Sequence, residues 1–270
     1  MRLLKIGLLA ALAVVSLLFG YVKITNMTQG VTEGPVISCQ QEGILEISVT
    51  DGEQALLAGM TAHDPQDGDL SDRILVGNVS QLVTENTAYV TYLVFDSHDN
   101  MAQYQRVVRY TDYRRPRISI DAPLVFAAED TQALLECLSA DDVVDGDISG
   151  RIRLSALWGT SRSDVYRVTA LVSNSMGDTM TLDLPVIVQE ELLGRPVIRL
   201  NRQIVYLEQG ATFDPMDYLS TVTVLDAPRN AQELVTEHQV DTGVPGTYWV
   251  YYLYSENGIQ GTAILTVVVL

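Results

Sequence analysis

Beyond the first 33 residues, the chain consists of short apolar runs in which polar residues occupy every second position. Val, Ile, Thr and Tyr fill these runs, and Asp, Gly, Pro and Asn separate them. Alternation with a period of two is typical of half-buried strands, and the intervening residues are typical of turns. The sequence therefore predicts an all-β fold.

Three pairs of runs, each separated by a turn cluster rich in Asn, Gly or Ser, are predicted to be β-hairpins. Their first strands cover residues 89–95, 166–172 and 248–254. Period-two alternation gives each first strand a face toward the core. The predicted inward residues are Tyr89, Thr91, Leu93 and Phe95; Tyr166, Val168, Ala170 and Val172; and Tyr248, Val250, Tyr252 and Tyr254.

The hairpins close three sequence repeats. Each repeat opens with Pro-x-Ile, at Pro35, Pro116 and Pro196, about 80 residues apart. Repeats of this length, with frequent turns, suit seven-stranded sandwiches. We predict an anchor and linker at residues 1–33, followed by domains at 34–112, 113–190 and 191–270. Residues 131–138 have helical propensity, but their counterpart in repeat 1 contains Gly59, and both segments are predicted to be strands.

The first two repeats share an Asp-rich loop, at residues 64–69 and 142–147, and the third keeps only a partial match at residues 213–217. With the Pro-x-Ile openings and the Pro-Gly-Thr-Tyr sequence at residues 245–248, these loops resemble bacterial immunoglobulin-like, cadherin-like domains found in tandem on surface proteins. The resemblance covers residues 34–270 and implies three tandem Ig-like β-sandwich domains. None of the repeats is a full match, because repeats 1 and 2 lack Pro-Gly-Thr and repeat 3 lacks Gly-Asp. The resemblance implies little about function, since such domains serve as spacers, adhesins and accessory modules.

The N-terminus predicts export. Arg2 and Lys5 precede an uncharged apolar run at residues 6–22, which Lys23 closes. A run of this length with a basic flank indicates a single transmembrane helix with its N-terminus in the cytoplasm. A cleaved signal peptide is the alternative. Either reading places the C-terminal ectodomain outside the cytoplasm.

The net charge of −17 argues against nucleic acid as a partner, since Lys5 and Lys23 are the only lysines. The acidic loops are candidates for calcium, because each places hard oxygen ligands around a glycine. Turns held by side-chain-to-backbone hydrogen bonds are the alternative. The candidate metal ligands are Asp64, Asp67, Asp69, Asp142, Asp145 and Asp147.

We predict no enzyme, no catalytic residues and no bound cofactor other than this calcium, because no nucleophile–base motif, zinc pattern or phosphate loop occurs. If Tyr248 and Val250 point inward, then Trp249 and Tyr251 point outward. These two form a candidate surface for a glycan or protein ligand on the membrane-distal domain. The predicted function is that of a membrane-anchored spacer, adhesion or binding module. An accessory subunit of an envelope complex, or a carbohydrate-active enzyme module, is the alternative.

Overall fold

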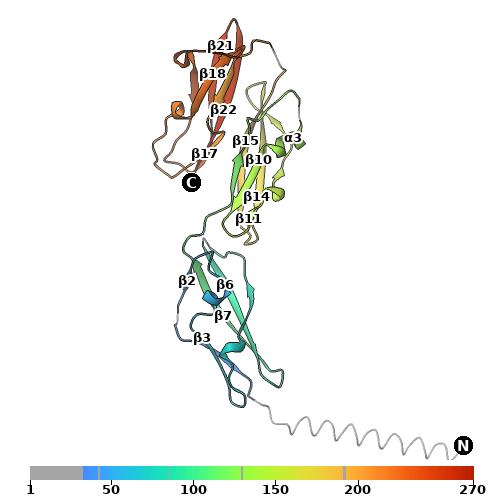
Figure 1. The fold of residues 1–270 in the computed structure, drawn as a ribbon, viewed down its shortest axis with the longest axis vertical. Coiled ribbons are helices and arrows are strands. Elements are labelled where there is room, and N and C mark those ends of the chain that lie inside the picture. The colour runs from blue at the N-terminus through green and yellow to red at the C-terminus, as the bar shows by residue number, and fades with distance from the viewer. Residues whose placement is uncertain (1–32, 42, 85, 129, 191–192) are drawn as a thin grey trace, which may run out of the picture. The chain divides into compact units, whose positions relative to one another are not determined.

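The computed structural model describes residues 33–270 except 42, 85, 129 and 191–192, and its architecture is all-β (Figure 1). Within these residues, helices are short, and none is long and apolar enough to cross a membrane. The predicted anchor at residues 6–22 lies outside the described residues. The three-domain boundaries stay a prediction, because the chain divides into two compact units.

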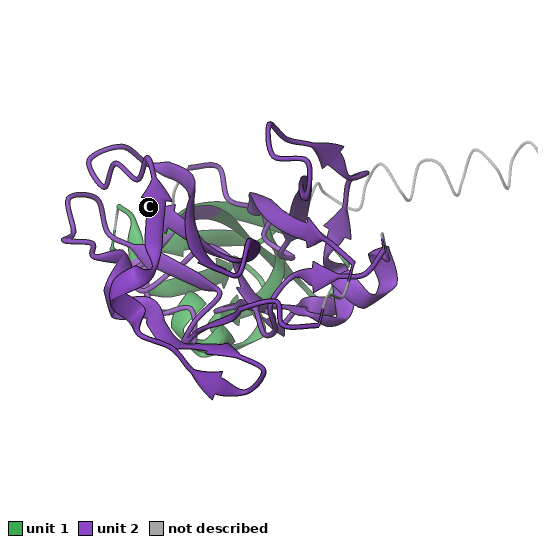
Figure 2. Cartoon of the chain, turned by 90° about the horizontal axis from the view of Figure 1, so that it is seen from above, with its two compact units in different colours: residues 1–45, 51–79, 89–108 green, residues 46–50, 80–88, 109–270 purple. Residues whose placement is uncertain are grey.

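Figure 2 colours these units. One comprises residues 1–45, 51–79 and 89–108, and the other comprises 46–50, 80–88 and 109–270. The second and third sequence repeats therefore fall in a single unit.

Repeat 1 contains two sheets, ordered β1-β3-β4 and β2-β7-β6-β5. Its elements are β1 (Val36–Cys39), β2 (Leu45–Ile47), α2 (Glu53–Leu56), β3 (Met60–Asp64), β4 (Gly68–Asp69), the 3-10 helix η1 (Ser71–Arg73), β5 (Leu75–Val79), β6 (Thr87–Phe95) and β7 (Met101–Tyr110).

Repeat 2 also has two sheets, ordered β11-β10-β8 and β12-β14-β15-β9, with β13 added alongside β14. Its elements are β8 (Arg117–Ile120), β9 (Val125–Phe126), α3 (Thr131–Glu136), β10 (Leu138–Asp142), β11 (Gly146–Asp147), η2 (Ser149–Arg151), β12 (Arg153–Leu154), β13 (Trp158–Gly159), β14 (Val165–Ser173) and β15 (Thr179–Val188).

Repeat 3 has sheets ordered β16-β18-β19 and β17-β22-β21-β20. Its elements are β16 (Val197–Leu200), β17 (Ile204–Leu207), η3 (Pro215–Tyr218), β18 (Leu219–Val224), β19 (Ala227–Pro228), η4 (Ala231–Glu233), β20 (Val235–His238), β21 (Gly246–Glu256) and β22 (Ile259–Val269). The hairpin β21–β22 turns at Asn257 and Gly258, both with positive φ, as its turn chemistry predicted.

The cores of repeats 2 and 3 contain side chains from both of their sheets, which is the arrangement of a β-sandwich. The isoleucine of each Pro-x-Ile opening is buried, at Ile37, Ile118 and Ile198. The inward faces predicted for repeats 2 and 3 are confirmed: Val168, Ala170 and Val172 are fully buried in repeat 2, and Val250, Tyr252 and Tyr254 are buried in repeat 3.

The inward face predicted for repeat 1 is wrong by one residue. Val90, Tyr92 and Val94 are fully buried, whereas Tyr89 and Phe95 are exposed. Ser97 donates to Asp67 in repeat 1, and Ser175 makes the same contact with Asp145 in repeat 2. Ser97 and Ser175 are therefore equivalent positions of the two repeats. The prediction paired Tyr89 with Tyr166, and this one-residue offset reverses every side chain of the strand.

The two segments predicted as strands before β3 and β10 are helices, α2 and α3. Asp130 caps α3, since its Oδ1 accepts from the backbone N–H groups of Gln132 and Ala133, both at 3.0 Å. Gly59, which favoured a strand in the prediction, has φ of 74° just after α2. A left-handed glycine at that position is a helix-termination signal.

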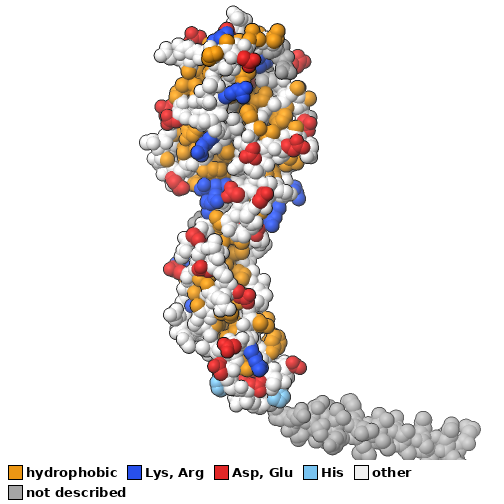
Figure 3. Space-filling model, viewed as in Figure 1, with side chains coloured by type: hydrophobic (Ala, Val, Ile, Leu, Met, Phe, Trp, Pro, Cys, Tyr) orange, Lys and Arg blue, Asp and Glu red, His pale blue; other side chains and the backbone are white. Residues whose placement is uncertain are grey.

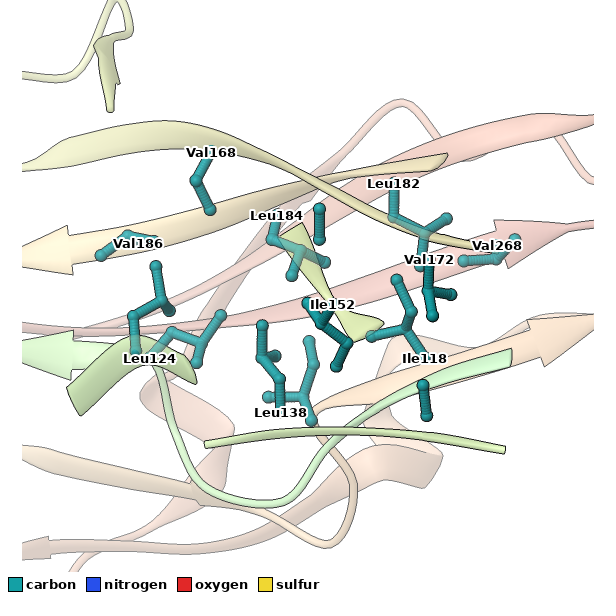
Figure 4. Close-up of a cluster of buried hydrophobic side chains, with 14 of the residues drawn as sticks. Ile118, Leu124, Leu138, Ile152, Val168, Val172, Leu182, Leu184, Val186 and Val268 are labelled. Carbon is teal, nitrogen blue, oxygen red and sulfur yellow. The ribbon is translucent and has the colours of Figure 1, made fainter. Parts of the chain in front are cut away.

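Repeats 2 and 3 also share buried apolar surface. Residues 263–269 of β22 are all buried: alternate positions fill the core of repeat 3, and the others face repeat 2. Val268 lies among side chains of the repeat 2 core, as Figure 4 shows beside Val172 and Leu182. Ile264 packs with Val165 and Ile187 of repeat 2. Burial on both faces explains why this segment is apolar at every position except Thr266.

Candidate functional site

Trp249 and Tyr251 on β21 point away from the core of repeat 3, as the sequence predicted, but they do so toward repeat 2. Trp249 and Tyr251 are partly buried and pack against the cluster of Val165, Ile187 and Ile264. They therefore form one wall of a contact between repeats and present only part of their surface to solvent.

Polar contacts fix both rings. The indole Nε1–H of Trp249 donates to the backbone oxygen of Asp183 on β15, at 3.0 Å. The guanidinium of Arg162 lies 4.5 Å from the centre of the Tyr251 ring, a cation–π distance, and forms an ion pair with Glu237 on β20. Burial raises the pKa of the Tyr251 hydroxyl, so this group stays neutral near pH 7. The two aromatic rings are thus held in fixed positions.

An open groove of about 580 Å³ runs along these rings. The β13–β14 connection contributes Arg162, and the sheet of repeat 2 contributes Arg167 and Asp183. Repeat 3 contributes Glu237, Tyr248, Trp249 and Tyr251. The groove therefore requires both repeats.

The charges in this groove are paired. Arg167 lies 3.7 Å from Asp183, whose other carboxylate oxygen accepts from the Thr169 hydroxyl at 2.7 Å. Together with the Arg162–Glu237 ion pair, this places two arginine side chains opposite two acidic side chains in the groove. Such a site offers aromatic faces and planar hydrogen-bonding groups without excess charge, and it suits a polar, ring-containing ligand.

The acidic residues of repeat 1 hold turns. Asp64 Oδ1 accepts from the N–H groups of Gln66 and Asp67, and Asp69 Oδ1 accepts from the N–H and hydroxyl of Ser71. Asp67 accepts from the N–H and hydroxyl of Ser97. These hydrogen bonds lower the pKa of the Asp67 and Asp69 carboxyls, because they favour the charged form.

Repeat 2 repeats this arrangement. Asp142 Oδ1 accepts from the N–H groups of Val144 and Asp145, and Asp147 Oδ1 accepts from Ser149. Asp145 accepts from Ser175 and forms an ion pair with Arg151. Burial raises the pKa of Asp145, but these hydrogen bonds outweigh it, and the net shift is downward.

Across the described part of the chain, no group of three or more His, Cys, Asp or Glu side chains is arranged to hold a metal ion. The six candidate calcium ligands thus accept hydrogen bonds from their own turns or, for Asp67 and Asp145, from the hairpin turns at Ser97 and Ser175. Calcium binding and the metal-free turn stay alternative predictions for these loops.

The acidic loops of repeats 1 and 2 differ in one hydrogen bond to a buried aspartate. Asp142 Oδ2 accepts from the side-chain amide of Asn174, at 3.1 Å. Repeat 1 has Asp96 at the position of Asn174, and a carboxylate cannot donate. Asp64 is buried, and its Oδ2 has no hydrogen-bond partner. Burying such an oxygen without a donor is costly.

Sequence reasoning found Trp249 and Tyr251 but missed Arg162, Arg167, Asp183 and Glu237. A signal was present in residues 263–269, where a run that is apolar except for Thr266 departs from period-two alternation. That departure indicates a strand buried on both faces, and therefore a contact beyond its own sandwich. It does not identify which charged residues would surround the contact.

No protein-family model matches the chain, and no curated protein matches its sequence. Among solved structures, it is similar to a Clostridium perfringens ZmpB structure comprising the M60 catalytic domain with two CBM51 domains. That similarity has 11% identity and a TM-score of 0.25, and it covers 87% of this chain and 30% of the other. The chain therefore spans less than a third of that protein.

The extracellular domain of protocadherin GammaB4 is another match, with 10% identity, a TM-score of 0.20, and coverage of 89% of this chain and 50% of the other. Human protocadherin-24 EC1-2 matches with 12% identity, a TM-score of 0.21, and coverage of 58% and 99%. Both of these neighbours are protocadherins, and the sequence resemblance to cadherin-like, immunoglobulin-type tandem domains names the same kind of domain. The similarity at these scores is weak, and the sandwich assignment rests on strand order and shared cores.

Proposed function

We propose that this chain is a non-enzymatic binding protein of the bacterial cell surface, built from three Ig-like sandwich domains. Residues 6–22 anchor it in the membrane with the N-terminus in the cytoplasm. The sandwiches then carry a ligand-binding groove outside the cell. Adhesion or ligand capture is the function that follows.

The single observation that supports this proposal is the groove between repeats 2 and 3. It combines the aromatic residues Trp249 and Tyr251 with hydrogen-bonding groups of Arg167 and Asp183. Binding sites typically combine apolar and aromatic lining with a few fixed polar groups. Here the polar groups are fixed by ion pairs and by the Trp249–Asp183 hydrogen bond.

The chemistry of the groove favours recognition over catalysis. General acid–base catalysis needs a group positioned to transfer a proton. Both carboxylates of the groove, on Asp183 and Glu237, already face arginines. Paired in this way, they serve as fixed hydrogen-bond acceptors for a ligand.

Surface charge is compatible with such a role. On the face in view, Figure 3 shows acidic and basic side chains interspersed with apolar ones. The net charge of −17 repels nucleic acid and anionic lipid headgroups. Partners of the ectodomain are therefore expected to be uncharged glycans or proteins.

The test uses the full-length protein in detergent, applied to arrays of glycans and of cell-envelope proteins. Arg167→Gln removes one groove cation whose side chain is 53% exposed, so the fold is kept. Arg109→Gln is the matched control, because Arg109 is 46% exposed and pairs with Glu46 outside the groove. We expect Arg167→Gln to weaken ligand capture about tenfold and Arg109→Gln to leave it unchanged. Equal effects of the two variants, or no capture by the parent protein, would refute the proposal.

A further inference from the structure

We infer that the ligand of this groove is an oligosaccharide that contacts two aromatic platforms, Trp249 within the groove and Trp158 beside it. This inference rests on the proposed function and adds the ligand class and a second contact site. Trp158 belongs to the short strand β13 and is 62% exposed, the most exposed aromatic side chain among the large exposed hydrophobics of the described residues.

Strand register places Trp158 on the face of the sheet that forms the groove. Trp158 is directly opposite Arg167 in the antiparallel pair β13–β14. Residues directly opposite each other project from the same face of a sheet. Leu157 packs against the core of repeat 2, so Trp158 next to it points outward. Since Arg167 lines the groove, Trp158 flanks the same surface.

The polar groups of the groove lie between the two rings. From Trp158 the sheet continues through Arg167 on β14 to Asp183 on β15, whose backbone oxygen binds Trp249. Two strand spacings separate β13 from β15, which is about 10 Å. A single hexose ring does not span both platforms, whereas a short oligosaccharide does.

This order of groups matches the chemistry of a sugar chain. A pyranose presents an apolar C–H face that stacks on an aromatic ring, and equatorial hydroxyls that meet planar polar groups at its edge. Trp158 and Trp249 supply the stacking faces, and Arg167 and Asp183 supply donors and acceptors between them. The paired charges suit an uncharged ligand.

A protein ligand fits these features less well. Protein hot spots are fully desolvated pockets filled by an anchor side chain. This groove is open, and Trp158 lies beside it, two strands away from the residue that binds Trp249. Two separate stacking faces suit consecutive rings of a sugar chain better than a single anchor side chain.

The experiment measures affinity as a function of chain length. The full-length protein in detergent is titrated by calorimetry with cello-oligosaccharides and N-acetylglucosamine oligomers of increasing length, after a glycan array has shown which series binds. We expect affinity to rise with length and then level off. Trp158→Ala should lower affinity for the longer oligomers by about threefold to tenfold and leave the shortest ligand unaffected. Phe95→Ala is the control, because Phe95 is an exposed aromatic residue outside the groove.

The alternative results separate failure of the two-platform inference from failure of the proposed function. Binding that does not depend on length, or that Trp158→Ala leaves unchanged while Arg167→Gln weakens it, overturns the two-platform inference and keeps the proposed function. Capture of a protein through Arg167, with no glycan bound on the array, also overturns the inference alone. Ligand capture that is insensitive to Arg167→Gln would instead refute the groove itself as the binding site.

Discussion

The hydroxyl group of Tyr206 makes two hydrogen bonds to one residue, Ile118, on a strand of a different repeat. It accepts from the backbone N–H of Ile118 at 3.0 Å and donates to the backbone oxygen at 2.8 Å. Ile118 lies on β8, an outer strand of its sheet. One side chain therefore satisfies both polar groups of an edge residue, as a neighbouring strand would do. With Val268 in the repeat 2 core, this contact joins repeats 2 and 3 into one unit.

Tyr206→Phe should destabilise this unit. The substitution keeps the ring, and with it the Arg117 guanidinium 4.9 Å from the ring centre, but leaves both Ile118 backbone groups without a partner. We expect a loss of about 1–3 kcal/mol in the free energy of unfolding, measured by urea denaturation. Tyr166→Phe is the control, since the Tyr166 hydroxyl makes no hydrogen bond to another residue in the described part of the chain. Equal stability of the two variants would show that water replaces the lost hydroxyl at no cost.

The same contact predicts a loss of stability at alkaline pH. Burial raises the pKa of Tyr206 to about 12, above the value of about 10 for an unfolded tyrosine. The folded state thus favours the protonated form, and this stabilisation is fully present below about pH 10 and is lost as pH rises toward 12. The stability difference between wild type and Tyr206→Phe should therefore shrink between pH 10 and 12. A difference that stays constant over this range would contradict the prediction.

Much of the fold could be predicted because strand alternation and turn chemistry are local. The hairpin β21–β22 and the inward face of β14 follow from period-two patterns. The error in β6 arose because a tyrosine at each strand start suggested the wrong alignment, and only the contact of Asp67 with Ser97 reveals the correct one. The helix α3 was missed because its counterpart in repeat 1 contains Gly59, which favoured a strand in the prediction rather than a helix end.

The candidate site was only partly predictable. Alternation placed Trp249 and Tyr251 on the outer face of β21, but the pattern does not say what lies opposite that face. Asp183 and Arg162 are distant in sequence from β21, and no local pattern links them to it. Their positions depend on how the sheets of two repeats pack, which follows from shape complementarity rather than from periodicity.

Calcium should leave the thermal stability of the protein unchanged. The carboxylates of Asp67, Asp69, Asp145 and Asp147 already accept hydrogen bonds from serines, and a bound ion would have to displace these donors. Differential scanning calorimetry of the full-length protein with calcium, with magnesium and with a chelator tests this. A rise in Tm specific to calcium would show that the loops rearrange into a metal site, because a ligand that binds only the folded state stabilises it.

Asn174→Asp should destabilise repeat 2. The Asn174 amide donates to Asp142 Oδ2 at 3.1 Å and to the Tyr113 hydroxyl at 2.9 Å. An aspartate loses both hydrogen bonds and adds a second negative charge beside buried Asp142, at an expected cost of about 2–4 kcal/mol at pH 7. Asn230→Asp is the matched control, because Asn230 Oδ1 accepts from the Gln232 N–H when capping η4, which an aspartate also does. The Asn230 amide donates only to the exposed Gln232 side chain, at 3.4 Å. If Asn174→Asp is as stable as Asn230→Asp in urea unfolding at pH 7, then the amide of Asn174 contributes nothing to the loop.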